Sequence, residues 1–373
     1  MLERVQGGGP GVRATVSPVT TVTDVCCAVH VHSLYSDGTG TVQEIARAAE
    51  RAGVDAVLLT DHDTMAARDG GQERRYGRVL VCVGVEVSPV GGDHCLAFGL
   101  ERPIVHRGLS APQILAAVDA AGGISFPAHP FSRGSRRFRR LGDGMPWSDL
   151  DADGYTGVEL WSFVTDTAES LGSLRRALGF VVSPGRVVDH PPRANIQAWD
   201  RMCAARRVVA IGGLDAHQLG KRIAGRVPLR LMAYRRSFSH LHTHVLAHGW
   251  TGVDADSDRR SLYAGLGEGR CYLAMDSLAP ARGFALWVDA GERVEQGGEA
   301  VVTAGTSATL HARLPRPAAV TVLRDGEPLA AHHGARIDLT LPGPGVYRLE
   351  AMLPAHGRMR TWILSNPVYL RGG

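Results

Sequence analysis

Two stretches near the N-terminus decide the fold: Cys26-Cys-Ala-Val-His-Val-His32 and Ala56-Val-Leu-Leu-Thr-Asp-His62. Each is a short apolar run, which is typical of a strand buried on both faces. The residues between them start a helix with the capping box Thr41-Val-Gln-Glu44, and the apolar stripe of this helix stops at Gly53. A strand, a helix and a second buried strand in this order indicate a βα unit.

The same alternation continues to about residue 217. A second capping box, Ser110-Ala-Pro-Gln113, precedes an apolar helical pattern that stops at Gly122, and a third helix is expected over Ala198–Arg207. The predicted fold class is therefore α/β with a largely parallel sheet or barrel. Further strands are expected over Val79–Ser88, His94–Leu100, Ile124–Pro130, Gly157–Phe163 and Val208–His217.

The character of the sequence changes after about Ala279. Short segments with period-two alternation follow, separated by turn signals such as Asp325-Gly326 and Pro342-Gly-Pro344. This pattern predicts a small all-β domain, most simply a sandwich. The expected organisation is an N-terminal extension over 1–23, an α/β domain over 24–282 and the β-sandwich over 283–373.

Composition and charge exclude several classes of partner. The chain has 41 basic and 37 acidic residues, and all of the basic ones except Lys221 are arginines, most of them scattered. A concentrated basic face is missing, so nucleic acid is not an expected partner. No run reaches the roughly 18 to 20 apolar residues that a membrane span needs. The absence of an apolar leader before Thr20, and six cysteines without CxxC spacing, favour reduced thiols in the cytoplasm.

Histidines and carboxylates gather where the expected strands end. Because the carboxyl ends of strands in βα units meet at one edge, these side chains are expected to lie together. Their nitrogen and oxygen donors suit Zn, Mn or Fe(II), and no cysteine joins the pattern. Nine donors exceed the needs of one tetrahedral ion, so two or three ions sharing a carboxylate are expected. The candidate ligands are His30, His32, Asp37, His62, Glu86, His94, His129, Asp215 and His217.

Each of these residues alone also has an ordinary structural explanation. Asp37 could hold an Asp-Gly turn, and Glu86 could form a salt bridge at a strand end. A single HxH pair is as often structural as functional. A third group of histidines, His240, His242 and His244, falls in a polar stretch outside the strand series, where surface or packing roles are expected.

The motifs at the strand ends together resemble the PHP (polymerase and histidinol phosphatase) metal-dependent hydrolases. The resemblance covers residues 24–280 and implies a distorted seven-stranded (β/α) barrel, similar to a TIM barrel, with up to three metal ions. The motifs are His30-Val-His32, Ser36-Asp-Gly38, Leu59-Thr-Asp-His62-Asp63, Gly84-Val-Glu86, His129-Pro130 and Asp215-Ala-His217.

The resemblance also implies how the ligands divide among the ions. One ion would bind His30, His32, Glu86 and Asp215. A second would share Glu86 and add His94 and His129. A third would bind Asp37, His62 and His217. Glu86, Asp215 and His217 would then belong to the catalytic centre.

Patterns further along the chain are similar to the PHP branch that includes carbaryl hydrolase-like proteins. They are Thr243-His-Val-Leu246, Gly269-Arg-Cys-Tyr272 and the segment from Trp362 to Tyr369. That branch appends a β-sandwich, which agrees with the pattern after Ala279.

The expected function is a metal-dependent hydrolase, most simply a phosphoesterase acting on a small phosphorylated molecule. A metal-bridging hydroxide would attack phosphorus in line. Arginine is the favoured bidentate partner of phosphate, and lysine also binds phosphate. The candidate substrate-binding residues are Arg133, Arg136, Arg137, Lys221 and Arg222.

Two other functions fit the same donors. A carboxyl ester or carbamate hydrolase would use the same metal site, with apolar groups such as Trp147, Trp161 and Phe163 around its substrate. A metal-binding module without turnover is the third candidate. The cofactors expected for all three are two or three divalent ions of Mn, Zn or Fe.

Overall fold

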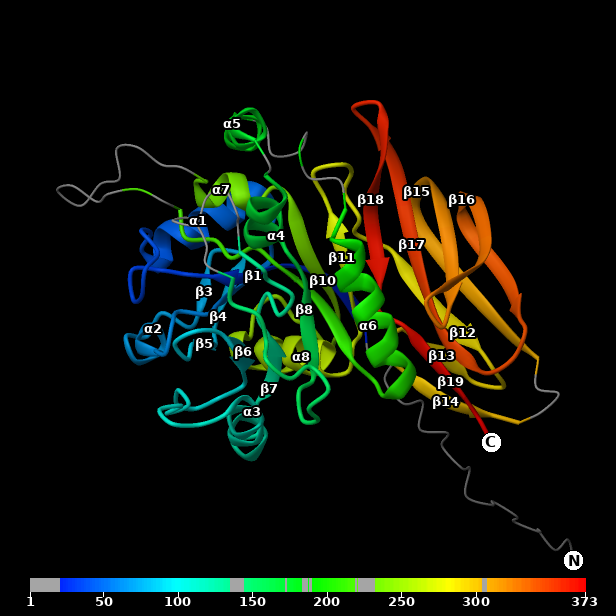
Figure 1. Ribbon diagram of the computed structural model, residues 1–373, viewed down its shortest axis with the longest axis horizontal. Helices are drawn as coiled ribbons and strands as arrows, with labels where there is room; N and C mark the ends of the chain where they lie inside the picture. The colour runs from blue at the N-terminus through cyan, green and yellow to red at the C-terminus, as the bar shows by residue number, and fades with distance from the viewer. Residues whose placement is uncertain are drawn as a thin grey trace, which may run out of the picture.

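A computed structural model describes residues 21–134, 144–171, 173–182, 187, 190–218, 220, 232–303 and 307–373. The chain is a mixed α/β protein with one large sheet of 14 strands and comparatively few helices. Helices gather around the N-terminal strands, and the C-terminal strands extend from the other side (Figure 1). The predicted extension over 1–23 lies almost entirely outside the described residues.

The N-terminal βα unit has the predicted form. Strand β1 (Val22–Val31) runs parallel to β2 (Ala56–Leu59), and β2 runs parallel to β4 (Val79–Val83). Helix α1 (Val42–Ala52) connects β1 to β2, and its capping box joins Thr41 to Glu44. Gly53 ends the helix with φ of 85°, a left-handed conformation that favours glycine.

The predicted largely parallel arrangement is wrong for part of the chain. The expected strand over Val79–Ser88 is interrupted at Gly84, and β5 (Val85–Val87) after it joins another sheet. There β5, β6 (Cys95–Phe98) and β7 (Ile124–Pro127) pair antiparallel. The connection between β5 and β6 is short, and parallel strands need a longer crossover.

A second small sheet pairs β8 (Gly157–Ser162) parallel with β9 (Val209–Gly213). The described strands of residues 21–303 therefore belong to three sheets, and a closed seven-stranded barrel stays a prediction.

The remaining helices are short. The predicted third helix begins five residues earlier than expected, at Arg193, directly after two prolines that suit a helix start. The short strand β3 (Arg75–Tyr76) pairs with β4. The other helices are α2 (Ala66–Asp69), α3 (Ala111–Ala120), α4 (Phe163–Ser170), α5 (Leu174–Val182), α6 (Arg193–Ala205), α7 (Tyr234–Ser237) and α8 (Ala255–Gly267).

The large sheet continues on the other side of β1. Strand β10 (Leu241–His248) pairs antiparallel with β1, and β11 (Cys271–Met275) pairs antiparallel with β10. The expectation that His242 and His244 lie outside the strands is wrong: both belong to β10 and are buried. Both faces of this central strand are covered, so its polar residues are buried together with its apolar ones.

The C-terminal strands are joined to the same sheet. Strand β18 (Arg358–Ser365) pairs antiparallel with β11 (Figure 1), and the buried Trp362 of β18 donates from Nε1 to the carbonyl of Ala279 at 2.7 Å. The C-terminal strands are β12 (Ala285–Asp289), β13 (Arg293–Glu295), β14 (Glu299–Val302), β15 (Ala308–Arg324), β16 (Glu327–Leu341), β17 (Gly345–Ala355), β18 (Arg358–Ser365) and β19 (Val368–Gly372). The boundary at residue 282 and the sandwich arrangement stay predictions.

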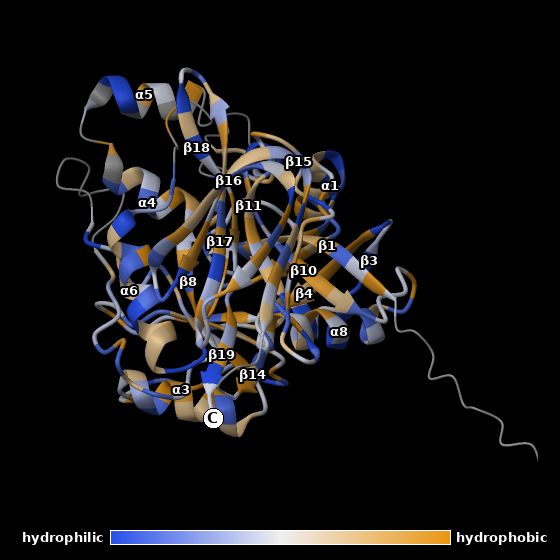
Figure 2. Ribbon diagram, turned by 90° about the vertical axis from the view of Figure 1, so that its right-hand side faces the viewer, coloured by the Kyte–Doolittle hydropathy of each residue, from blue (hydrophilic) through white to orange (hydrophobic). Residues whose placement is uncertain are grey.

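The core follows the strands. Apolar residues, orange in Figure 2, concentrate on the strands in the middle of the molecule. All six cysteines are free, which agrees with the predicted reduced thiols, and all six are buried. Among the helices in the described part of the chain, none is long and apolar enough to cross a membrane.

Candidate metal centre

The structure brings all nine candidate ligands into one region. They lie on or next to strands of all three sheets. All of them except His30 and His32 line a cavity of about 280 Å³. Their donor atoms form groups whose members lie within 4.8 Å of one another. These groups are His30 with Glu86 and His129, His30 with His32 and Asp215, His62 with Glu86 and His94, and His32 with Asp37, His62 and His217.

Unusual backbone conformations position three of these ligands. His30, His129 and Asp215 have φ of 63°, 32° and 52° respectively, although residues with a Cβ rarely adopt positive φ. The pairing of β1 with β2 shifts register between Val29 and Val31, on either side of His30. Such conformations persist only where the surrounding structure holds them, which is typical of functional sites.

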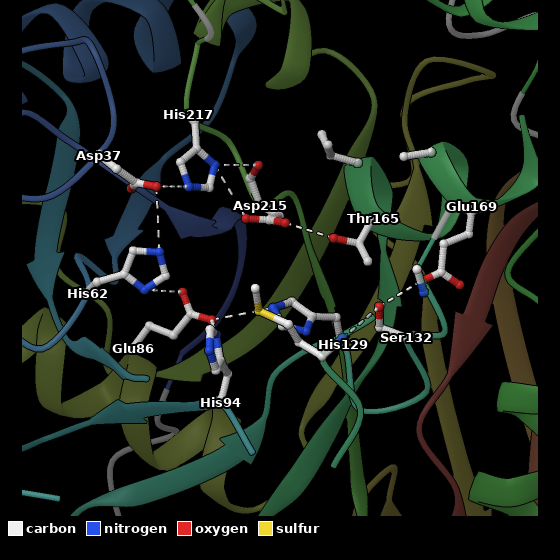
Figure 3. A pocket seen from close by; sticks show the side chains of 14 residues that line it. Asp37, His62, Glu86, His94, His129, Ser132, Thr165, Glu169, Asp215 and His217 are labelled. Atoms are coloured by element: carbon white, nitrogen blue, oxygen red, sulfur yellow. Dashed lines mark hydrogen bonds and ion pairs between the residues drawn. The ribbon is translucent and has the colours of Figure 1, made fainter. Parts of the chain in front are cut away.

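Glu86 lies at the centre of the site. Its Oε2 is 3.2 Å from Nε2 of His30, 3.2 Å from Nε2 of His32 and 3.3 Å from Nδ1 of His62. Its Oε1 is 2.9 Å from Nδ1 of His94 and 3.4 Å from Nε2 of His129. The two oxygens of one carboxylate thus face two different sets of histidines, as a bridging ligand requires. Figure 3 shows Glu86 between His62 on one side and His94 and His129 on the other.

The ligands form a gradient from the interior to the surface. His30 and Glu86 are 0% and 1% exposed, whereas Asp37 and His62 are 55% and 31% exposed at their side chains. Asp37 Oδ2 lies 3.1 Å from Nε2 of His217 and 3.7 Å from Nε2 of His62 (Figure 3). The Asp37 side of the site is therefore the side open to solvent.

The electrostatics of the site couple its carboxylates to its histidines. Burial would raise the pKa of Glu86, but the charge and hydrogen bonds of the histidines around it hold this pKa well below its usual range. Burial would lower the pKa of His129 and His217, but Glu86 raises the first to about 9 and Asp37 raises the second to about 9. In the absence of a metal ion, protons on these histidines therefore balance the negative charge of the carboxylates.

The donor set fits divalent ions. Both ring nitrogens of the fully buried His32 and the Nδ1 of the buried His129 make no hydrogen bond. A buried polar atom without a hydrogen bond is costly, and a cation beside these nitrogens would offset that cost. Imidazole and carboxylate donors suit Zn, Mn and Fe(II). How the nine residues divide among ions stays a prediction.

Glu159 is a further site residue, and the strand-end pattern in the sequence does not include it. It lies on β8 and is 1% exposed. Its Oε1 is 2.9 Å from Nδ1 of His30, and its Oε2 accepts the backbone N–H of His129 at 2.6 Å. This is the partner that fixes the tautomer and orientation of a metal-ligating histidine. A carboxylate inside the apolar run Gly157-Val-Glu-Leu160 is the signal that could have revealed it.

Close packing and hydrogen bonds hold other parts of the site. A Cβ at Gly213 would overlap the Glu159 carboxylate and lie 3.0 Å from the Cβ of His30, so only glycine fits there. The hydroxyl of Thr165 donates to Asp215 Oδ2 at 2.8 Å (Figure 3). Asp61 accepts 2.7 Å hydrogen bonds from the backbone and side chain of Ser33, and so orders the loop that carries Asp37.

The structure places one of the five predicted substrate-binding residues. Arg133 is exposed, its backbone N–H donates to Glu169 at 2.8 Å, and it lines a second cavity with Pro130 and Arg201 rather than the cavity of the metal ligands. The other four, Arg136, Arg137, Lys221 and Arg222, lie outside the described residues.

The apolar residues expected for an ester substrate are buried elsewhere. Trp147, Trp161 and Phe163 belong to the core and are not among the described residues that line the metal cavity. Its described walls beyond the metal ligands are Ser132, Gly134, Met145, Val164, Thr165, Ala168 and Glu169.

The fold and these side chains define an α/β protein with a buried centre of nitrogen and oxygen donors. In the comparison with known proteins, residues 28–122 match the model of the PHP domain.

Two curated relatives match shorter parts of the chain. An uncharacterised protein of Methanocaldococcus jannaschii is 28% identical over 141 residues, which are 34% of this chain and 77% of that protein. A phosphoribosyl 1,2-cyclic phosphate 1,2-diphosphodiesterase of Eggerthella lenta is 36% identical over 81 residues, 20% of this chain and 30% of that protein.

One solved structure spans nearly the whole chain. It is a two-domain protein of Bacteroides vulgatus, described as containing a predicted PHP-like metal-dependent phosphoesterase. It is 14% identical, covers 96% of this chain and 100% of its own, and has a TM-score of 0.44.

Proposed function

We propose that this protein is a metal-dependent phosphoesterase that hydrolyses a small phosphorylated molecule. The observation that carries the proposal is the position of Glu86, whose two oxygens face two separate sets of histidines inside a cavity. The PHP domain supports it, as does the similarity to a phosphodiesterase over 81 residues.

The geometry supports the division of ligands that the family resemblance implies. His30, His32 and Asp215 would hold one ion with Glu86 Oε2, and His94 and His129 would hold a second with Oε1. The group of Asp37, His62 and His217 would hold a third at the open side. Bound ions of this kind lower the pKa of water held between them and neutralise charge on phosphoryl oxygens.

The protein's own residues would set the geometry of this reaction. Glu86 fixes the separation of the two histidine sets because one rigid carboxylate contacts both. Glu159 holds His30 in the tautomer that presents Nε2 to the site, and Thr165 restrains Asp215. The exposed Asp37 marks the side from which substrate would enter.

Among the described residues, no arginine lines the metal cavity. The proposed phosphate contacts therefore rest on Arg136, Arg137, Lys221 and Arg222, together with the ions themselves. Arg133 would contribute only if its side chain turned toward the neighbouring cavity.

The test is a hydrolysis panel on protein loaded with Mn or Zn, using phosphomonoesters, phosphodiesters and uncharged aryl esters. We expect phosphoester turnover that Asp215→Asn abolishes and that Asp119→Asn, an exposed carboxylate on α3, leaves unchanged. Turnover of aryl esters alone would establish the esterase alternative. Metal binding without hydrolysis of any substrate would establish a non-catalytic module.

A further inference from the structure

A second group of metal-binding side chains lies outside the nine ligands. It consists of Cys26 on β1, His242 and His244 on β10, and Asp276 directly after β11. Their donor atoms lie within 4.8 Å of one another. Cys26 precedes His30 by four residues, about 13 Å along an extended strand, so this group is separate from the site around Glu86.

The hydrogen bonds of His242 show which nitrogen faces the group. Its Nε2 lies 2.7 Å from the carbonyl of Phe238, and its Nδ1 lies 2.7 Å from Oδ2 of Asp276. A carbonyl oxygen only accepts, so Nε2 carries a hydrogen. The Nδ1 of a neutral ring then directs its lone pair at a carboxylate, so the contact is favourable only when Nδ1 binds a proton or a metal ion.

His244 is held in the same way. Its Nδ1 lies 2.7 Å from Oδ1 of Asp24, and its Nε2 lies 2.9 Å from Oδ2 of Asp276. The other oxygen of Asp24 accepts the Tyr272 hydroxyl and the backbone N–H of Gly283, both at 2.7 Å. Asp24 therefore orients His244 from outside the group, as the carboxylate partner of a metal-ligating histidine does.

Cys26 and Asp276 complete the group. The Sγ of Cys26 lies 3.9 Å from Oδ2 of Asp276, and the other oxygen of Asp276 accepts the backbone N–H of Ala281 at 2.8 Å. Burial would raise the pKa of the Cys26 thiol, but His242 and His244 lower it to about 7. One sulfur, two imidazole nitrogens and one carboxylate oxygen thus converge, each side chain oriented by its surroundings.

We propose that Cys26, His242, His244 and Asp276 form a structural zinc site. Four donors of this kind match the tetrahedral coordination of Zn²⁺, and all four positions are filled by the protein, as in structural rather than catalytic sites. The ion would fasten β1, β10 and β11 to the segment over 276–283, which leads into the C-terminal strands. The sequence-based expectation about cysteine concerned only the nine strand-end donors, and it does not address this second group.

The same contacts without an ion would be a buried network of two protonated histidines and two aspartates. The two arrangements differ in the state of the sulfur. A zinc site makes Cys26 a ligated thiolate, whereas the ion-pair network needs no bond to sulfur. A readout specific for metal–thiolate bonding therefore separates them.

The first experiment loads the full chain with Co²⁺ in place of zinc and records its absorption. Thiolate-to-cobalt charge transfer in the near ultraviolet is expected, and the site around Glu86 cannot supply it because no cysteine belongs to that site. Absence of this band in the cobalt-loaded wild-type chain would overturn the proposal without any variant.

The second experiment measures zinc per chain by elemental analysis. Cys26→Ala should lose the charge-transfer band and one equivalent of zinc. The matched control is Cys27→Ala, because Cys27 is the next residue of β1, is also buried, and belongs to a different apolar cluster. Unchanged zinc content in Cys26→Ala would refute the site. Neither readout depends on hydrolysis, so failure of the proposed phosphoesterase activity would leave this test intact.

Discussion

Replacing Glu159 by glutamine tests whether this residue of β8 orients His30 and His129 for metal binding. The wild-type carboxylate uses both oxygens as acceptors, one 2.9 Å from His30 Nδ1 and one 2.6 Å from the backbone nitrogen of His129. Glutamine has nearly the same size but only one acceptor oxygen. In Glu159→Gln, one of these two donors must therefore face an NH₂ group instead of an oxygen.

The expected size of the effect follows from these two contacts. Leaving a buried donor without an acceptor costs about 1 to 3 kcal/mol, and 1.4 kcal/mol corresponds to about a factor of ten. Glu159 is 1% exposed, so water cannot replace the lost acceptor. We expect metal affinity to fall by about 10- to 100-fold, the range typical of residues that orient metal ligands.

The assay is a metal titration of the metal-free protein, followed by activity at saturating metal. Glu159→Gln should need more metal to reach half occupancy, and its activity should recover in large part at saturation. The control is Glu73→Gln, because Glu73 is a largely buried carboxylate that pairs with Arg259 and contacts none of the candidate ligands. Equal metal affinity in Glu159→Gln and wild type would refute the assigned role.

Three further predictions follow from the same geometry. Glu86→Gln should lose more metal and more activity than His94→Ala, because Glu86 contacts both sets of histidines, whereas His94 contacts only one oxygen of Glu86. Equal losses in elemental analysis and in kcat/KM would count against the bridging role. Metal binding at pH 7 should release protons from His129 and His217, because their pKa values of about 9 leave them protonated in the metal-free protein. Calorimetry in buffers of different ionisation enthalpy measures the number of protons released. A binding enthalpy that does not depend on the buffer would contradict the prediction. Ending the chain before Gly283 should lower the thermal midpoint or prevent folding, because β11 then loses its hydrogen-bonded partner β18. A truncated chain as stable as the full one would show that the part before Gly283 does not depend on the C-terminal strands.

Local signals in the sequence were sufficient for the N-terminal βα unit. The capping box at Thr41 and the stop at Gly53 act within one helix, so neither depends on distant parts of the chain. The nine candidate ligands could be named for a similar reason. Ionisable residues interrupt apolar runs at strand ends, and the alternation of elements predicts that these ends meet.

Other features depend on pairing between distant segments. Glu159 reads as one polar residue within a strand, and its role exists only because β8 brings it to His30. His242 and Cys26 are 216 residues apart in the numbering, and the antiparallel pairing of β10 with β1 brings them together. The antiparallel sheet of β5, β6 and β7 likewise depends on which strands become neighbours, which apolar periodicity does not specify.

The most direct test of the metal centre is anomalous X-ray diffraction from crystals soaked with Mn²⁺ or Zn²⁺. We expect at least two anomalous peaks, both within coordination distance of the Glu86 carboxylate, one near His30 and His32 and the other near His94 and His129. Crystals that contain the metal but show no anomalous peak beside Glu86 would refute the proposed metal centre.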